Sequence, residues 1–139
     1  MTVDGGLRKI VRLHLPEFHW QAIESGMTSP GIPDSNYCYG GREGWVEFKQ
    51  TKHWAVGLRP HQIGWLSRRA HSGGRVRIAV RQLRAGQDSL WIVDGGRARE
   101  LSETGLQGLQ GGGPGLLGVW YGGPPGWDWS AVRLALLEP

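Results

Sequence analysis

Residues 31–50, GIPDSNYCYGGREGWVEFKQ, are the stretch that decides the fold. The part before Gly40 is rich in residues that suit a pleated strand, and residues 45–51, WVEFKQT, have the same character. Gly40 and Gly41, followed by REG, make a hairpin connection between the two segments. The sequence therefore predicts two neighbouring antiparallel strands joined by a short turn.

Helical and extended patterns continue on both sides of this hairpin. Upstream, residues 6–15 have apolar side chains near helical spacing and end at Pro16, and residues 18–25 are expected to form a strand. Downstream, residues 58–72 predict a helix that ends before two glycines, and residues 75–83 and 89–95 predict neighbouring strands. The predicted fold class is α/β, a small domain with a mixed central sheet of about four or five strands flanked by helices.

The last third of the chain gives mixed signals. Residues 98–110 fit a short third helix, and residues 105–126 contain ten glycines. This segment is either a mobile loop or a string of tight turns around a short strand at residues 116–122. Residues 128–138 have a helical pattern with Asp128 at the N-cap position. We expect residues 1–139 to form a single domain with its core at about residues 7–95, to which residues 105–126 and 128–138 are appended.

Composition limits the class of protein. With 139 residues, 39% of them apolar and eight of them tryptophan, the chain is long and hydrophobic enough to fold around one core. No apolar run matches a membrane span and no secretory signal core is visible, so we expect a cytoplasmic protein with no membrane partner. Cys38 is the only cysteine, which excludes an internal disulfide. The five histidines lack zinc-enzyme spacing, and the absence of a phosphate-loop motif predicts no nucleotide cofactor.

Positive charge is concentrated in the N-terminal part of the chain. Residues 1–84 contain thirteen lysines and arginines and six acids, a balance of +7, whereas residues 85–139 contain three and six, a balance of −3. No acid falls between Glu47 and Asp88, but nine lysines and arginines do. Such a one-sided run favours a polyanionic partner such as nucleic acid. A solvated surface gives the same pattern and is the other interpretation.

Three side chains around the hairpin carry the chemistry. Alternate residues of a strand share a face, so Glu47 and Lys49 point the same way, and the hairpin can bring Asp34 beside them. Two converging carboxylates are costly unless a cation joins them, and an all-oxygen site suits Mg²⁺. A lysine beside such an ion orients water and stabilises charge on an attacked phosphate. In the structural alternative, Asp34 is a turn residue and the other two form an exposed pair.

This motif resembles that of the PD-(D/E)XK nuclease superfamily, with Pro33 and Asp34 followed by Glu47, Phe48 and Lys49. Together with residues 58–76, LRPHQIGWLSRRAHSGGRV, it is similar to the VRR-Nuc and Holliday-junction resolvase branch carried by many phages. In that branch a glutamine lies near the start of the helix after the strand, which is the place of Gln62 here. The resemblance spans roughly residues 18–82.

The resemblance implies a restriction-endonuclease-like fold and a metal-dependent endonuclease that hydrolyses phosphodiester bonds in DNA. The cofactor is Mg²⁺, for which Mn²⁺ substitutes, and the substrate is branched or junction DNA cut by a homodimer. If the protein is phage-encoded, it acts in the cytoplasm of the bacterial host. The implied catalytic residues are Asp34, Glu47, Lys49 and Gln62. The implied metal ligands are Asp34, Glu47 and the backbone carbonyl of Phe48.

A further acidic ligand often comes from upstream in such nucleases, generally from the first helix. The chain departs from this pattern, because its predicted first helix contains no glutamate. Glu24 is favoured as the ligand since it precedes the turn that leads into the Asp34 strand, and Glu17 is the other candidate. A surface carboxylate is an equal interpretation of Glu24.

The predicted DNA contacts are the basic residues near the motif: Lys52, Arg59, His61, Arg68 and Arg69. Trp54 and Trp65 flank the motif; they either stack on unpaired bases or, as is commoner for tryptophan, belong to the core. An alternative function is a non-catalytic or sequence-specific DNA-binding or nicking protein of the same fold. A phage structural or assembly protein is a third possibility, for which the sequence offers no positive feature.

Overall fold

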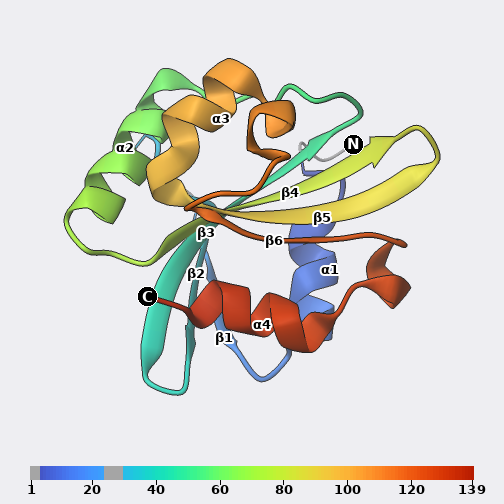
Figure 1. Ribbon diagram of the computed structural model, residues 1–139. Coiled ribbons are helices and arrows are strands. Elements are labelled where there is room, and N and C mark those ends of the chain that lie inside the picture. The colour runs from blue at the N-terminus through green and yellow to red at the C-terminus, as the bar shows by residue number, and fades with distance from the viewer. Residues whose placement is uncertain (1–3, 24–29) are drawn as a thin grey trace.

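The computed structural model describes residues 4–23 and 30–139 (Figure 1). In this part of the chain, a six-stranded mixed sheet is flanked by four α-helices, so the protein belongs to the α/β class. The strands are β1 (His19–Ala22), β2 (Ser35–Tyr39), β3 (Arg42–Thr51), β4 (Val76–Arg84), β5 (Gln87–Asp94) and β6 (Leu116–Trp120). The helices are α1 (Leu7–His14), α2 (Pro60–His71), α3 (Ala98–Thr104) and α4 (Trp129–Leu137).

The strands lie in the sheet in the order of the sequence, from β1 to β6. Each neighbouring pair is antiparallel except β3 and β4, which are parallel. A parallel pair needs a crossover connection, and α2 provides it between the end of β3 and the start of β4. The crossover returns the first turn of α2 to the middle of β3, where Gln62 contacts Glu47.

Helices cover both faces of the sheet (Figure 1). α1 and α4 pack on one face against Val46 and Phe48 of β3, and α2 and α3 pack on the other face with Ile78 of β4. Because side chains alternate along a strand, Glu47 and Lys49 face α2 while Val46 and Phe48 face α1 and α4. The predicted alternation along this strand is confirmed.

The carboxyl end of α4 is tied to the sheet by Arg77, which is 1% exposed. Its guanidinium donates to the Ala135 carbonyl at 2.9 Å and to the Glu138 carbonyl, and it pairs with the Asp94 carboxylate at 3.0 Å. The last carbonyls of a helix have no partner within the helix, so these bonds satisfy them and fix α4 against the sheet.

The predicted helices and strands between residues 6 and 95 are confirmed, with bounds that differ from the predicted ones by a few residues. The strand expected at residues 18–25 is described from His19 to Ala22, and residues 24 and 25 lie outside the described residues. The helix expected from residue 58 begins at Pro60, since proline suits the first turn of a helix, where its missing N–H costs nothing. Asp128 caps α4 as predicted, because its side chain accepts a hydrogen bond from the Ala131 N–H.

The prediction of four or five strands is wrong, because residues 116–120 add a sixth strand, β6, at the edge of the sheet beside β5. The residues expected as an appendage therefore belong to the packed structure. Val132 and Leu136 of α4 are buried in the same cluster as Leu7 and Val11 of α1. The glycines around β6 gave a loop-like pattern, and the strand forms because β5 supplies the hydrogen-bonding partner.

The helix predicted at residues 98–110 ends at Thr104. Gly105 has a φ of 69°, and a Cβ at this position would lie 2.6 Å from the Trp54 carbonyl oxygen. The chain then continues as a 3-10 turn that buries Leu106 and Leu109. Among the helices of the described residues, none is long and apolar enough to cross a membrane.

Candidate active site

The pairing of β2 with β3 brings the predicted acids together. Ser35 pairs with Val46, so one further step of the same antiparallel register puts Asp34 opposite Glu47. The Phe48 N–H donates a hydrogen bond to Asp34 Oδ2 at 3.3 Å, which fixes the carboxylate across the two strands. Thirteen positions separate Asp34 from Glu47 in the sequence, and the hairpin removes that separation.

Gln62 joins the strand residues to α2. Its side-chain amide donates to Glu47 Oε2 at 3.3 Å, and its oxygen accepts hydrogen bonds from Lys49 Nζ at 3.3 Å and from the Arg59 N–H at 2.9 Å. Lys49 Nζ also lies 3.7 Å from Glu47 Oε2. Gln62 thus caps α2 and orients the Glu47 carboxylate and the Lys49 ammonium group. These contacts, with the position of Asp34 opposite Glu47, support the sequence prediction that Asp34, Glu47, Lys49 and Gln62 meet.

Gly31 allows the segment before Asp34 to pack on the first turn of α2. Its φ is 91°, and a Cβ at this position would lie 2.3 Å from the His61 carbonyl oxygen. Only glycine fits such a close approach in this left-handed conformation. This close contact sets the position of the segment before Asp34 relative to Gln62.

Both carboxyl groups are held in an environment that disfavours their charge. Burial and, to a smaller extent, the charge of Asp34 raise the pKa of Glu47 from 4.5 to about 7, against the lowering effect of Lys49. Burial likewise raises the pKa of Asp34 from 3.8 to about 6, against the opposing effect of the hydrogen bond from Phe48. Glu47 is only 6% exposed. A cation bound between the carboxylates of Asp34 and Glu47 would offset the free-energy cost of their negative charges.

The donor set suits a hard divalent cation. Asp34 Oδ1 is buried and has no hydrogen-bond partner within the described residues, so one carboxylate oxygen is left to bind something else. Carboxylate and carbonyl oxygens are the ligands that Mg²⁺ prefers, with water and phosphate completing the shell. The described residues contain no group of three or more acids, histidines or cysteines that would enclose an ion completely. The donors available from these residues are therefore the carboxylates of Asp34 and Glu47.

Two upstream glutamates, Glu17 and Glu24, were predicted as candidates for a third acidic ligand. Glu17 forms an ion pair with Arg133 of α4 at 3.5 Å, and its role as a site ligand stays a prediction. Glu24 lies outside the described residues, so its role stays a prediction. The role of the Phe48 carbonyl as a metal ligand also stays a prediction, although the Phe48 N–H contacts Asp34.

The predicted DNA contacts are all exposed but lie at different distances from the acids. Arg59 and His61 flank Gln62 at the start of α2, and Lys52 follows the last residue of β3. Arg68 and Arg69 lie in the last turns of α2. The structure therefore places Arg59 and His61 beside Gln62, with Lys52 beyond the end of β3 and Arg68 and Arg69 farther along α2.

The two tryptophans near the motif pack in the interior, in agreement with the core interpretation. Trp54 meets Trp91 edge to face with ring centroids 6.4 Å apart, and Trp65 meets Trp45 at 5.5 Å. Both are partly buried against the cluster beneath α2 and α3. Their packing accounts for them without a ligand.

Two charged residues near the site were missed from the sequence. Asp4 and Arg8 act on Asp34 with opposite sign, Arg8 lowering and Asp4 raising the pKa of its carboxyl. Asp4 also accepts hydrogen bonds from the N–H groups of Gly6 at 2.9 Å and Arg8 at 3.3 Å, so it caps α1. The sequence signal for Asp4 is its place just before the first predicted helix, whereas the upstream acid was predicted to be Glu24 or Glu17.

No family model matches the chain, and no curated protein matches it significantly. The function proposed below is therefore based on the geometry of the site.

Proposed function

We propose that the protein is a magnesium-dependent endonuclease of the PD-(D/E)XK type, with a restriction-endonuclease-like fold, which hydrolyses phosphodiester bonds in DNA. One observation carries the proposal: Gln62 is hydrogen-bonded to both Lys49 and the buried Glu47, and the Asp34 carboxylate is held beside them by the Phe48 N–H. These are the residues that the sequence motif selects. A half-buried lysine beside two carboxylates of raised pKa is a costly arrangement that structure alone does not require.

Asp34 and Glu47 would hold the metal, with the Phe48 carbonyl as a third ligand. Bound there, Mg²⁺ would lower the pKa of an attacking water and offset negative charge on the phosphate. Lys49 Nζ donates to Gln62 in the absence of substrate, and the same N–H groups can turn to a phosphate oxygen that enters the site. Gln62 keeps the Glu47 carboxylate oriented through its amide N–H.

The charges around the site favour a polyanionic substrate. Arg59 and His61 at the start of α2 and Lys52 after β3 are exposed, and they are close in sequence to residues of the cluster. They would contact the backbone on either side of the cleaved bond, a role that fixes position without reporting sequence. Branched DNA is the substrate we propose, cut by a homodimer so that two sites act on two strands.

A non-catalytic DNA-binding module is the competing function, and metal binding separates the two. A binder gains nothing from two buried carboxylates beside phosphate, so Mg²⁺ should bind the nuclease and leave a binder almost unaffected. The test is incubation of the protein with labelled junction, flap, single-stranded and duplex DNAs in Mg²⁺, in Mn²⁺ and in EDTA. Cleavage that needs the metal and is lost in Glu47→Gln supports the proposal; binding without cleavage of any of these DNAs contradicts it.

A further inference from the structure

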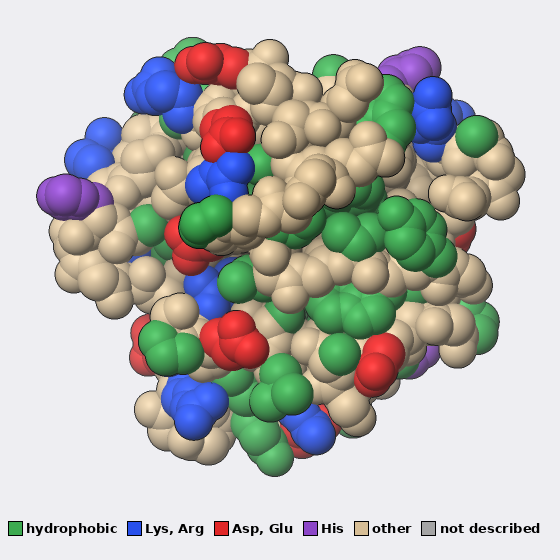
Figure 2. Space-filling model, in the orientation of Figure 1, with side chains coloured by type: hydrophobic (Ala, Val, Ile, Leu, Met, Phe, Trp, Pro, Cys, Tyr) green, Lys and Arg blue, Asp and Glu red, His purple; other side chains and the backbone are tan. Residues whose placement is uncertain are grey.

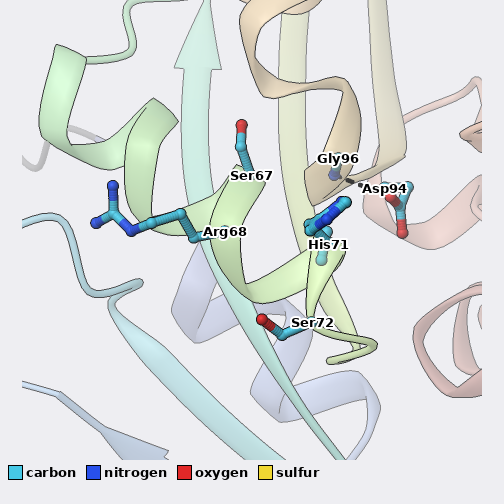
Figure 3. Close-up of a pocket in the computed structure, with 7 residues that line it drawn as sticks. Ser67, Arg68, His71, Ser72, Asp94 and Gly96 are labelled. Atoms are coloured by element: carbon cyan, nitrogen blue, oxygen red, sulfur yellow. Dashed lines mark hydrogen bonds between the residues drawn. The ribbon is translucent and has the colours of Figure 1, made fainter.

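The carboxyl-terminal half of α2 borders two hollows away from the carboxylates. One of about 730 Å³ is lined by Ser67, Arg68, His71, Ser72 and Asp94, among others, and a second of about 180 Å³ lies against Trp65 and Arg69. Arg68 and Ser72 line both, so the hollows adjoin along the helix. In Figure 3, the Arg68 side chain extends away from His71 and Asp94.

The arginines of this surface are not engaged by acids. Arg68 and Arg69 form no ion pair with a carboxylate in the part of the chain that the structure describes, whereas Arg77 and Arg81 do, at 3.0 and 2.6 Å. Figure 2 shows basic side chains and a histidine at the left edge of the molecule, over α2. These two guanidinium groups are therefore available to an anion that reaches the helix.

Arg69 lies against two indole rings. Its guanidinium carbon lies 4.6 Å from the centre of the Trp65 ring and 5.6 Å from that of Trp45. A guanidinium fixed on indole loses little further freedom when it binds, and it still offers its N–H groups and its outer face. Such a plane suits a phosphate or the face of a base.

The one acid of the larger hollow does not oppose an anion. Asp94 Oδ1 pairs with the buried Arg77 at 3.0 Å, and Asp94 Oδ2 accepts the Gly96 N–H at 2.9 Å. Its charge is thus compensated from beneath by Arg77. The hollow presents hydroxyl groups of Ser67 and Ser72 beside the imidazole of His71.

This surface leads from the proposed reaction centre. A helix rises 1.5 Å per residue, so Arg69 lies roughly 10 Å and Ser72 roughly 15 Å from Gln62 along α2. One DNA strand carries a phosphate about every 3.4 Å of the duplex axis, so these lengths correspond to roughly three and four nucleotides. Arg68 bends back toward the site: its Nη1 lies 2.9 Å from the place where a Cβ on Gly64 would stand. The absence of a side chain at Gly64 leaves room for it.

We propose that the outer surface of α2 formed by Arg68, Arg69, His71 and Ser72 is a track for the sugar-phosphate backbone of DNA, about three to four nucleotides from the cleaved bond. This inference rests on the proposed nuclease function and adds to it the path of the substrate. The ligand is the phosphate of the strand, and the flat Arg69 guanidinium makes one of the contacts.

Binding and cleavage measured separately test the track. Fluorescence anisotropy without divalent metal, on a labelled duplex and a labelled junction, compares Arg68→Ala and Arg69→Lys with wild type. The matched control is Arg42→Ala, an exposed arginine in the hairpin between β2 and β3. Arg68→Ala should weaken binding about tenfold and flatten the slope of log affinity against log salt by roughly 0.9. Arg69→Lys keeps the charge but loses the plane, so affinity should fall with little change in slope.

Each outcome decides a different claim. Affinities and salt slopes of both variants equal to those of wild type overturn the track, as does an equal loss in Arg42→Ala. Circular dichroism confirms that each variant is folded before its affinity is compared. Cleavage in Mg²⁺ is measured on the same DNAs: wild type that cuts while the variants bind normally retains the nuclease and removes the track. Wild type that binds through these arginines but never cuts retains the surface and removes the proposed function.

Discussion

Neutralising one acid of the site should make the metal-free protein more stable. The pKa of Asp34 is raised from 3.8 to about 6 and that of Glu47 from 4.5 to about 7. A carboxyl whose folded pKa lies above its unfolded pKa holds its proton more tightly in the folded state. The contribution of these two carboxyl groups to the stability of the folded state is therefore greatest at low pH and is lost as pH rises from about 4 to about 7.

The size of this effect follows from the pKa differences. One pKa unit corresponds to about 1.4 kcal/mol, so an elevation of two units costs about 3 kcal/mol for a fully charged group. The charge of Asp34 contributes to the elevation of Glu47, so the two elevations do not add in full, and we expect about 3 kcal/mol for the pair between pH 5 and pH 8. In a domain of this length that is a decrease in Tm of roughly 10 °C.

The assay is thermal unfolding followed by tryptophan fluorescence at pH 5 and pH 8, with and without Mg²⁺. At pH 8 without metal, Asp34→Asn should unfold at a higher temperature than wild type, because the substitution removes the charge and keeps the volume. Mg²⁺ at a hundred times its Kd should stabilise wild type by about 2.7 kcal/mol at pH 8, and much less at pH 5, where protons compete for the carboxylates. Asp34→Asn should lose this response.

Glu103→Gln is the matched control, since Glu103 is an exposed carboxylate on α3. It should leave both the pH dependence and the response to Mg²⁺ unchanged. Wild type that is as stable at pH 8 as at pH 5, or Asp34→Asn that is less stable than wild type at pH 8 without metal, would refute the argument that the site is strained by its own charges.

Three further predictions concern the same cluster. Asp34→Asn or Glu47→Gln should abolish cleavage while DNA affinity stays near that of wild type; a residual rate above about a tenth, a barrier change below about 1.4 kcal/mol, contradicts the site. Lys49→Ala should lose nearly as much rate yet keep or increase its affinity for Mg²⁺, because a positive neighbour is removed from a cation site; calorimetry showing that metal binding is lost as well would make the lysine structural. Gly31→Ala should destabilise the fold by more than about 1 kcal/mol in urea, since its φ is 91° and the His61 carbonyl lies 2.3 Å from the new Cβ; Gly113→Ala, with a φ of 109° and open space around it, is the control and should cost less.

The hairpin was predictable because its signals are local. Strand alternation places Glu47 and Lys49 on one face, and two glycines define the turn, so the relation of these residues to Asp34 follows from short-range geometry. Gln62 was found through the resemblance, and the reason for its position emerges only in the structure. Its side chain bridges Glu47 and Lys49 across a crossover connection, which is a contact between elements that are distant in the sequence.

The remainder depended on contacts that no local pattern contains. Leu116 to Trp120 form the short strand that was one of two interpretations of this segment, and the edge of β5 decides between that strand and a loop. Asp4 acts on Asp34 because of the way α1 docks on the sheet, and spacing along the chain carries no record of that docking. Both cases are tertiary effects that override the local pattern.

The basic run between Glu47 and Asp88 illustrates the same limit for charge. Sequence alone presents its nine cations as one surface, yet Arg77 is 1% exposed and its guanidinium binds the end of α4, while Arg81 pairs with Asp88 at 2.6 Å. A buried arginine that satisfies helix carbonyls cannot also neutralise a phosphate, so part of the run serves folding. The cations of the run on α2 have no such partner in the described chain. Fewer cations are therefore available to a polyanion than the sequence suggests, and Arg68 and Arg69 of α2 are among those that remain.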